Sequence, residues 1–357
     1  MSLDKIDKIE RKVLNGERIQ GREAVDLFNS SQLLTLGVLA EAVRRRLHPD
    51  SVVTYIIDRN VNYTDICISG CKFCAFFKAP GDPQGFVISL DQLGEKIRET
   101  EELGGNQILL QGGLHPDKPL EFYEEMLRFI KGYRVKVHGF SPPEIAHFAQ
   151  LAELPTREVL MRLRRAGLDS MPGGGAEILS DGVRAEIAPR KCGADAWMTI
   201  MEEAHELGMR TTATMMFGHL ESLEQRIEHL QRIRDLQDRT KGFTAFIPWP
   251  FQPDNTALAQ VRKATAVEYL KMLALSRIFL DNVANIQASW VTQGPKIAQL
   301  SLFFGANDFG STMIEENVVA AAGVSFRLSE AEICKLVRGA GFEARRRSMD
   351  YTLLTVS

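Results

Sequence analysis

Short apolar runs alternate with longer amphipathic stretches along most of this chain. β-Branched and aliphatic residues fill positions 52–57, and seven further short apolar runs follow. Runs this short, bounded by turn residues, are typical of strands buried on both faces. The pattern therefore predicts eight strands, at 52–57, 107–110, 135–138, 169–171, 210–216, 244–247, 285–288 and 302–305.

Between these runs, apolar residues recur at helical spacing. The predicted helices are 90–103, 120–130, 157–166, 196–207, 223–236, 266–280 and a short one near 295–300. Gly104, Gly167 and Gly208 follow three of them, where glycine relieves a left-handed cap. Strand–helix alternation predicts a parallel sheet with right-handed crossovers. Eight such units favour an α/β fold of the closed (β/α)8 TIM type over a doubly wound sheet.

The flanking segments extend this predicted barrel at both ends. Residues 1–50 have helical spacing, as at Ile6, Ile9 and Val13, and form an N-terminal helical extension. The barrel takes residues 51–327. Residues 328–357 supply a helix at 331–339 and a strand-like run at 351–356, packed on the barrel. No linker rich in Pro, Gly or Ser divides the chain, so we predict one domain.

Composition narrows the possible partners. The chain has 357 residues, with 43 Lys+Arg against 46 Asp+Glu and a net charge of −3. This balance gives no electrostatic basis for nucleic-acid binding. No apolar run approaches the ~20 residues that span a bilayer, so no membrane partner is expected. The charged N-terminus lacks an apolar signal core, which predicts a cytoplasmic protein.

Three of the five cysteines, Cys67, Cys71 and Cys74, fall within one short loop after the first predicted strand. Thiolates select zinc or iron–sulfur centres. Structural zinc needs four protein ligands, and no fourth Cys or His lies between residues 50 and 106. Three thiolates can instead hold three irons of a 4Fe–4S cluster and leave the fourth iron open for a substrate. Zinc and merely buried or redox-active thiols remain alternatives.

The predicted strand ends carry the other candidate residues. In such barrels the carboxyl ends of the strands build the active site. Gln111-Gly112-Gly113 follows the second strand, His138 ends the third, and three glycines and Glu177 follow the fourth. Asp308 lies just past the eighth. Glycines let a ligand approach bare backbone, although each alone is also an ordinary turn former, and His138 alone could be a hydrogen-bonded wall residue.

The spacing Cys-x3-Cys-x2-Cys, with Phe73 before the last cysteine, resembles the signature of the radical S-adenosylmethionine (SAM) superfamily. The resemblance implies one 4Fe–4S cluster, since Cys192 and Cys334 are isolated. It also implies SAM bound to the open iron and cleaved to a 5′-deoxyadenosyl radical. Phe73 and Gln111-Gly112-Gly113 would contact this ligand, and Glu177 would meet its ribose hydroxyls. Leu114 stands where the superfamily often has an acidic residue, which leaves that contact to backbone carbonyls.

Within the superfamily, the chain from residue 34 onward resembles the cyclic dehypoxanthine futalosine synthases of the futalosine menaquinone pathway. The segments that carry this resemblance are 58–64, 74–77, 171–177, 211–218 and 246–253. It implies hydrogen abstraction from the ribose C4′ of dehypoxanthine futalosine. The sugar radical then attacks the substrate's aromatic ring, and an electron and a proton are lost.

The same resemblance implies further roles. The substrate's benzoate needs a cation, for which Arg59, Arg190 and Lys296 are candidates. The proton acceptor is expected to be His138, with Asp308 as the alternative. An external electron donor such as flavodoxin or ferredoxin would reduce the cluster. An aminofutalosine synthase, an FO-synthase-like radical enzyme and a non-catalytic metal-binding module are the alternatives.

Overall fold

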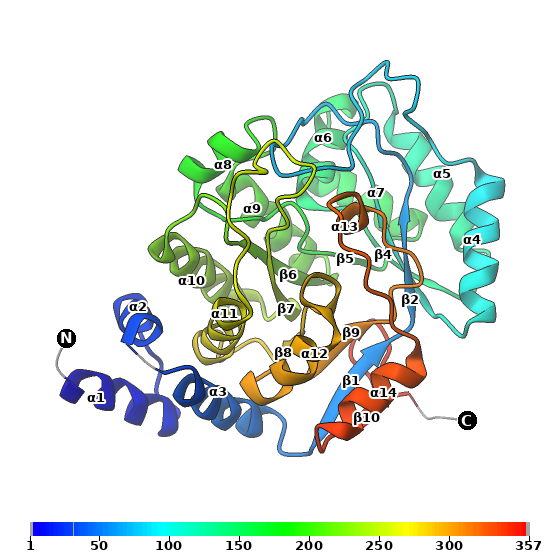
Figure 1. Ribbon diagram of the computed structural model, residues 1–357. Coiled ribbons are helices and arrows are strands. Elements are labelled where there is room, and N and C mark those ends of the chain that lie inside the picture. Colours follow the sequence, from blue (N-terminus) through cyan, green and yellow to red (C-terminus); the bar gives the residue numbers. More distant parts are fainter. Residues whose placement is uncertain (1–2, 31, 355–357) are drawn as a thin grey trace.

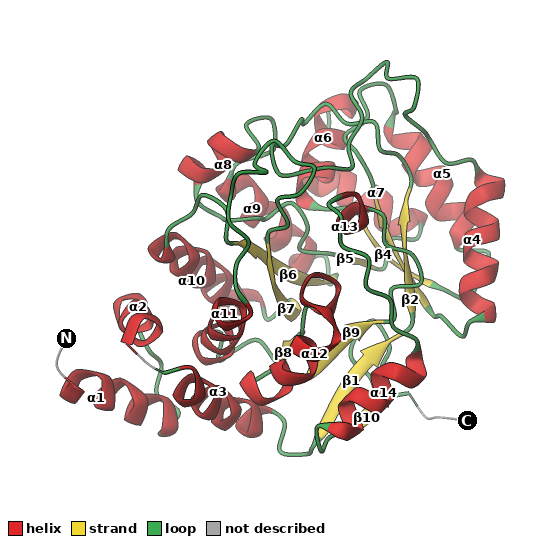
Figure 2. Cartoon of the chain, in the orientation of Figure 1, coloured by secondary structure: helices red, strands yellow, loops and turns green. Residues whose placement is uncertain are grey.

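Parallel strands curl into an α/β barrel that is covered outside by helices (Figures 1 and 2). The computed structural model describes residues 3–30 and 32–354. Seven strands form the main sheet in chain order, and every neighbouring pair is parallel, as predicted. They are β2 (Asp58–Asn62), β3 (Gln107–Gln111), β4 (Lys136–Gly139), β5 (Ser170–Met171), β6 (Arg210–Phe217), β7 (Phe243–Pro250) and β8 (Asn285–Ile286).

A second parallel sheet closes the ring. Its order is β10–β1–β9, with β1 (Val52–Ile56), β9 (Asp308–Ser311) and β10 (Glu343–Arg346). A bridge between Gln287 and Asp308 joins the β8 edge to β9. On the other side β1 runs through Ile57 directly into β2, and Thr312 N donates to Ile56 O at 3.0 Å. The TIM-type barrel predicted from strand counting is confirmed.

Helices surround this barrel and bury their apolar faces against it. Leu93, Leu163 and Leu273, from three different helices, are all fully buried. None of the helices in the described chain is long and apolar enough to cross a membrane. They are α4 (Leu90–Glu102), α5 (Leu120–Ile130), α6 (Pro142–Ala152), α7 (Thr156–Ala166), α8 (Asp181–Ile187), α9 (Ala194–Glu206), α10 (Leu223–Thr240), α11 (Ala266–Phe279), α12 (Trp290–Ser301), α13 (Val318–Ala321) and α14 (Glu330–Gly339).

The N-terminal extension is helical, as predicted for residues 1–50 within the described part of the chain. It forms α1 (Leu3–Leu14), α2 (Gly21–Ser30) and α3 (Leu33–Leu47). These helices lie beside α10 and α11 on one flank of the barrel (Figure 1). Arg18 pairs with Asp238 at 2.6 Å and with Asp281 at 2.7 Å, which ties the segment after α1 to that flank.

Two predicted strands differ from the structure. The run 52–57 forms only the first half of the first strand of the barrel. The chain continues past Ile57 into the polar strand β2, which forms the second half. The run 302–305 forms the 3-10 helix η1 (Leu302–Phe304), since a short apolar run cannot distinguish a buried strand from a buried helix. The eighth position belongs to β9 instead. Consequently Asp308 is the first residue of a strand and does not follow one.

The C-terminal segment also differs from its prediction. The helix expected at 331–339 is present as α14, but the following strand is β10 and not the run at 351–356. The last two residues of that run lie outside the described residues. The polar sequence of β10 hides it from apolar patterning, yet it pairs with β1 along its whole length. Helices α6 and α8 were not predicted, and α6 begins with Pro142-Pro143, residues favoured in a first helical turn.

Candidate active site

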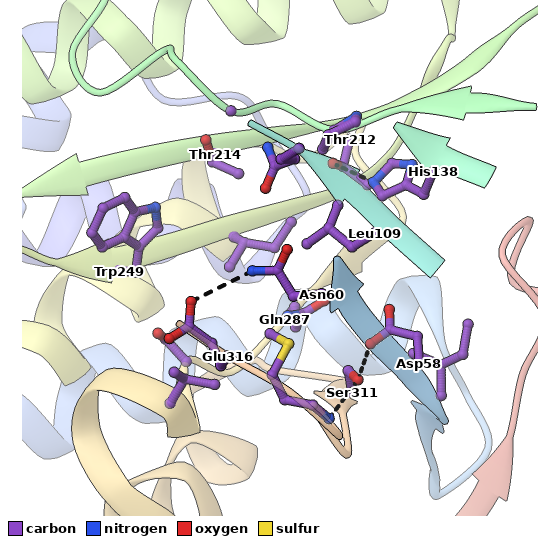
Figure 3. A pocket seen from close by; sticks show the side chains of 18 of the residues that line it. Asp58, Asn60, Leu109, His138, Thr212, Thr214, Trp249, Gln287, Ser311 and Glu316 are labelled. Atoms are coloured by element: carbon purple, nitrogen blue, oxygen red, sulfur yellow. Dashed lines mark hydrogen bonds between the residues drawn. The ribbon is translucent and has the colours of Figure 1, made fainter. Parts of the chain in front are cut away.

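A cavity of about 300 Å³ occupies the barrel lumen. Its wall is formed by alternate residues of each strand, because every second side chain of a parallel barrel points inward. Asp58 and Asn60 of β2 point into it, and so do Thr212 and Thr214 of β6 (Figure 3). Its size is at the lower end of the range for small-molecule sites. Other lining residues are Gln107, Leu109, Gln111, His138, Gly174, Gly175, Glu177, Trp249, Gln287, Ser311, Met313, Glu316, Arg347, Met349 and Tyr351.

One end of the cavity is a polar floor built where β2, β3 and β9 meet. Gln107 Nε2 donates to Asp58 Oδ2 at 2.7 Å. Ser311 Oγ donates to Asp58 Oδ1, as Figure 3 shows. Burial raises the pKa of this carboxyl, partly offset by these two hydrogen bonds. Arg347, from the segment after β10, adds a positive charge to the floor and forms an ion pair with Asp308.

His138 stands midway up the same wall. Its Nδ1 lies 2.8 Å from Ser170 Oγ, which itself donates to Arg210 O, so Nδ1 carries the proton. Nε2 is then free to accept, and Thr212 Oγ1 lies 3.4 Å from it (Figure 3). Burial, together with the charge of Arg347, lowers the pKa of His138 to about 3. The imidazole is therefore a neutral hydrogen-bond acceptor and a weak base.

The cysteine loop lies past the carboxyl end of β2. All five cysteines are free, and Cys71 is buried. Two backbone N–H groups point at Cys67 Sγ, from Leu114 at 3.3 Å and Ser69 at 3.4 Å. Such N–H···S contacts are typical of iron–sulfur ligands, whose negative charge they stabilise. Burial raises the pKa of the Cys71 and Cys74 thiols, so a bound metal is needed to hold these two as thiolates.

The three thiols fit a cluster better than a single ion. Among the described residues, no three Cys, His, Asp or Glu side chains are placed to hold one metal ion. A mononuclear zinc site, which needs four convergent ligands, has no counterpart there. A 4Fe–4S cluster takes each thiolate on a different iron, so its ligands stand farther apart.

The glycine pair after β3 lies against this loop. A Cβ on Gly113 would stand 2.2 Å from Ile66 O and 2.9 Å from Cys67 Cβ. Behind the pair, Gly112 N donates to the buried Glu144 carboxylate at 3.2 Å, which also accepts from Tyr63 OH at 2.7 Å. Glycine is required here because the loop packs directly on the bare backbone.

Glu177 carries an unsatisfied acceptor. Its Oε1 accepts from Lys191 Nζ at 2.9 Å, while Oε2 is buried, has no hydrogen-bond partner among the described residues and lies 3.7 Å from Arg184 Nη1. Its backbone is left-handed, with φ of 41°, an uncommon conformation that clusters at ligand sites. Lys191 Nζ also stands 5.1 Å from the Phe73 ring centroid, which connects Glu177 to the cysteine loop. This geometry fits the ribose contact implied for Glu177.

None of the three cations predicted for the substrate carboxylate lines the cavity. Arg59 faces away from the lumen, because it alternates with the inward-pointing Asp58, and it pairs with Glu99 at 2.7 Å. Arg190 donates to Ile68 O at 2.7 Å and so supports the cysteine loop. Lys296 is exposed on α12.

Asp308, the alternative proton acceptor, is also outside the cavity lining. It is fully buried and bound by Thr54 Oγ1 at 3.0 Å, by Gly310 N and by Arg347. The residues that sequence reasoning missed are Asp58 and Arg347. The alternation of Asp58, Asn60 and Asn62 signals an inward polar face, but only once β2 is recognised as a strand.

Sequence similarity decides the family. A profile described as the radical SAM superfamily matches residues 61–233, and one described as the CofH/MqnC C-terminal region matches residues 240–357. The chain is 45% identical over 351 residues to a cyclic dehypoxanthine futalosine synthase of Halalkalibacterium halodurans, covering 98% of this chain and 95% of that one. It is a radical SAM enzyme.

A second relative supports the same family assignment. The cyclic dehypoxanthine futalosine synthase of Streptomyces coelicolor is 47% identical over 346 residues, which are 96% of this chain and 87% of that one. Among solved structures, the FeFe-hydrogenase maturase HydG of Carboxydothermus hydrogenoformans superposes with a TM-score of 0.78 at 18% identity, over 98% of this chain and 81% of that one. That similarity shows the barrel fold alone. Membership in the superfamily identifies the cofactors as a 4Fe–4S cluster and SAM, as predicted.

Proposed function

We propose that this radical SAM enzyme converts dehypoxanthine futalosine to cyclic dehypoxanthine futalosine in menaquinone biosynthesis. The observation that carries the proposal is identity of 45% and 47%, over nearly the whole chain, to two enzymes of that name. The cavity in the barrel lumen supports it, because radical chemistry on a small molecule needs a site that shields the radical from competing hydrogen donors.

In this proposal Cys67, Cys71 and Cys74 would hold the cluster, and SAM would bind beside it. When bound, the two supply a 5′-deoxyadenosyl radical. The methionine amino group would meet backbone carbonyls of the segment Gln111-Gly112-Gly113, with Phe73 of the cysteine loop nearby. Glu177 Oε2, which has no hydrogen-bond partner among the described residues, accepts from the ribose hydroxyls, and Lys191 and Arg184 fix that carboxylate. Because position 114 is leucine, the contact with the methionine amino group rests on backbone carbonyls and needs no acidic side chain there.

The cavity wall then has to place the substrate with its C4′ hydrogen toward the cysteine-loop end. His138 accepts a hydrogen bond through Nε2, since Nδ1 is committed to Ser170. Thr212 and Thr214 line the same wall and add hydroxyl groups. Holding the reacting atoms close replaces a bimolecular encounter with a prearranged one. Arg190 orients the cysteine loop in place of binding the substrate.

The remaining proposals concern the electron donor, the cellular compartment and the domain organisation. A flavodoxin- or ferredoxin-type protein reduces the cluster, and the enzyme works in the cytoplasm. Residues 1–50 and 328–357 act with the barrel as one domain. The position of Arg347 in the cavity supports this for the C-terminal segment.

The test is anaerobic incubation of the reconstituted enzyme with SAM, reductant and dehypoxanthine futalosine, followed by mass spectrometry. The expected product is two hydrogens lighter than the substrate and accompanied by free 5′-deoxyadenosine. A product that contains the adenosyl group would instead favour an aminofutalosine-synthase-like reaction. Cys71→Ser should abolish both products. Cys192→Ser, a control outside the loop, should leave both.

A further inference from the structure

Asp58 and Arg347 line the cavity floor, and Asp308 is buried outside the lining. Arg347 forms its ion pair with Asp308, which is also bound by Thr54 and by Gly310 N. The Asp58 carboxylate has no cation within ion-pair distance among the described residues and accepts hydrogen bonds from Ser311 and Gln107. Arg347 therefore acts on Asp58 only from beyond ion-pair distance, while its direct partner is Asp308.

A buried carboxylate without a partner gains stability by taking a proton, because burial penalises the charged form. Asp58 also lines the cavity, whereas Asp308 does not. The two aspartates therefore differ in their ability to accept a proton from a molecule in the cavity. Asp308 is paired with the Arg347 guanidinium, while the Asp58 carboxylate faces the substrate space and has no ion-pair partner among the described residues.

We propose that Asp58 accepts the proton that leaves the substrate's aromatic ring after ring closure. This inference rests on the proposed function. The C4′ radical first forms a carbon–carbon bond to the ring. The hydrogen on that ring carbon then leaves as a proton to Asp58, and the remaining electron passes to a one-electron acceptor of the iron–sulfur class. Aromaticity is restored and no further co-reactant is needed.

The geometry favours Asp58 over the other polar groups of the wall. His138 is a weak base, as its lowered pKa shows. Glu316 accepts from the backbone N–H groups of residues 318–320 and thus caps α13. Glu177 accepts from Lys191, which also contacts Phe73 of the cysteine loop. Asp58 alone combines a place in the lining with the absence of both an ion pair and a capping role among the described residues.

Asp58→Asn tests the proposal, because the amide keeps the shape and both hydrogen bonds once Gln107 flips. We expect it to abstract the C4′ hydrogen and release 5′-deoxyadenosine, but to lower cyclic product per 5′-deoxyadenosine by ~100-fold, the usual size of a general-base effect. In this variant, cyclic product should form more slowly still when the aromatic ring of the substrate carries deuterium at the carbon that loses the proton. Asp169→Asn, the same change beside β5 and outside the cavity, should leave the ratio unchanged.

Asp58→Glu separates a chemical role from a structural one. A proton acceptor predicts that the longer carboxylate recovers part of the ratio that Asn loses. A structural role predicts the reverse, because Asn is isosteric with Asp and Glu is not. A wild-type product ratio in Asp58→Asn, or a lower ratio in Glu than in Asn, would overturn the proposal. If the wild-type enzyme makes no cyclic product, the proposed function itself fails.

Discussion

Replacing Gly113 with alanine should damage the cluster site specifically. The added Cβ would lie 2.2 Å from Ile66 O and 2.9 Å from Cys67 Cβ, whereas ordinary contact begins at 3.4 Å. Because the nearer atom belongs to the backbone, no rotamer change removes the clash. The cysteine loop must move by more than an ångström at the residue that precedes the first ligand.

Overpacking of this kind costs ~1–3 kcal/mol of unfolding free energy. The displacement also moves Cys67 relative to the other two thiols, so we expect Gly113→Ala to retain less than half of the wild-type iron after anaerobic reconstitution. Iron and sulfide assays measure the cluster, and denaturant unfolding of the apoprotein measures the stability.

Gly182 in α8 provides the control, since nothing lies within 4 Å of the Cβ that alanine would add. Alanine is the better helix former, so Gly182→Ala should keep full iron content and gain up to ~1 kcal/mol. If Gly113→Ala bound as much iron as Gly182→Ala and unfolded at the wild-type denaturant concentration, the close packing of the loop on the glycine pair would be refuted.

Three further predictions concern stability and cofactor binding. Burial lowers the pKa of His138 and His229 to about 3 and of His205 to about 4, so below pH 6.5 the unfolded chain binds more protons than the folded one. Stability should fall by ~2 kcal/mol per histidine between pH 7 and pH 5 in denaturant titrations, and an unchanged midpoint would contradict this. Asp308→Asn should lose ~3–5 kcal/mol in the same assay by stranding its guanidinium partner; a loss under 1 kcal/mol would count against the buried pair. Glu177→Gln should weaken SAM binding about tenfold by equilibrium dialysis, by removing a charged acceptor, and unaltered affinity would exclude that contact.

The sequence predicted the barrel because its helices and most of its strands repeat a simple pattern. The cysteine loop was predictable for a different reason, since ligand spacing is local. Glu177 lies in the loop after β5 and lines the cavity, and its ribose contact stays a prediction.

The floor of the cavity was not predictable in this way. It depends on strand registers and on a C-terminal segment far away in sequence. Arg347 reaches the lumen only because β10 pairs with β1, and β10 has no apolar pattern to reveal it. Arg59 was a reasonable candidate by position, but a shift of one residue along a strand turns a side chain to the other face. Tertiary pairing, and not composition, decides which charges face the substrate.

The most direct test of the account is a single turnover with dehypoxanthine futalosine deuterated at the ribose C4′. The account predicts one deuterium in the 5′-deoxyadenosine released and none at C4′ of the cyclic product. Unlabelled 5′-deoxyadenosine, or deuterium retained at that carbon in the product, would contradict it.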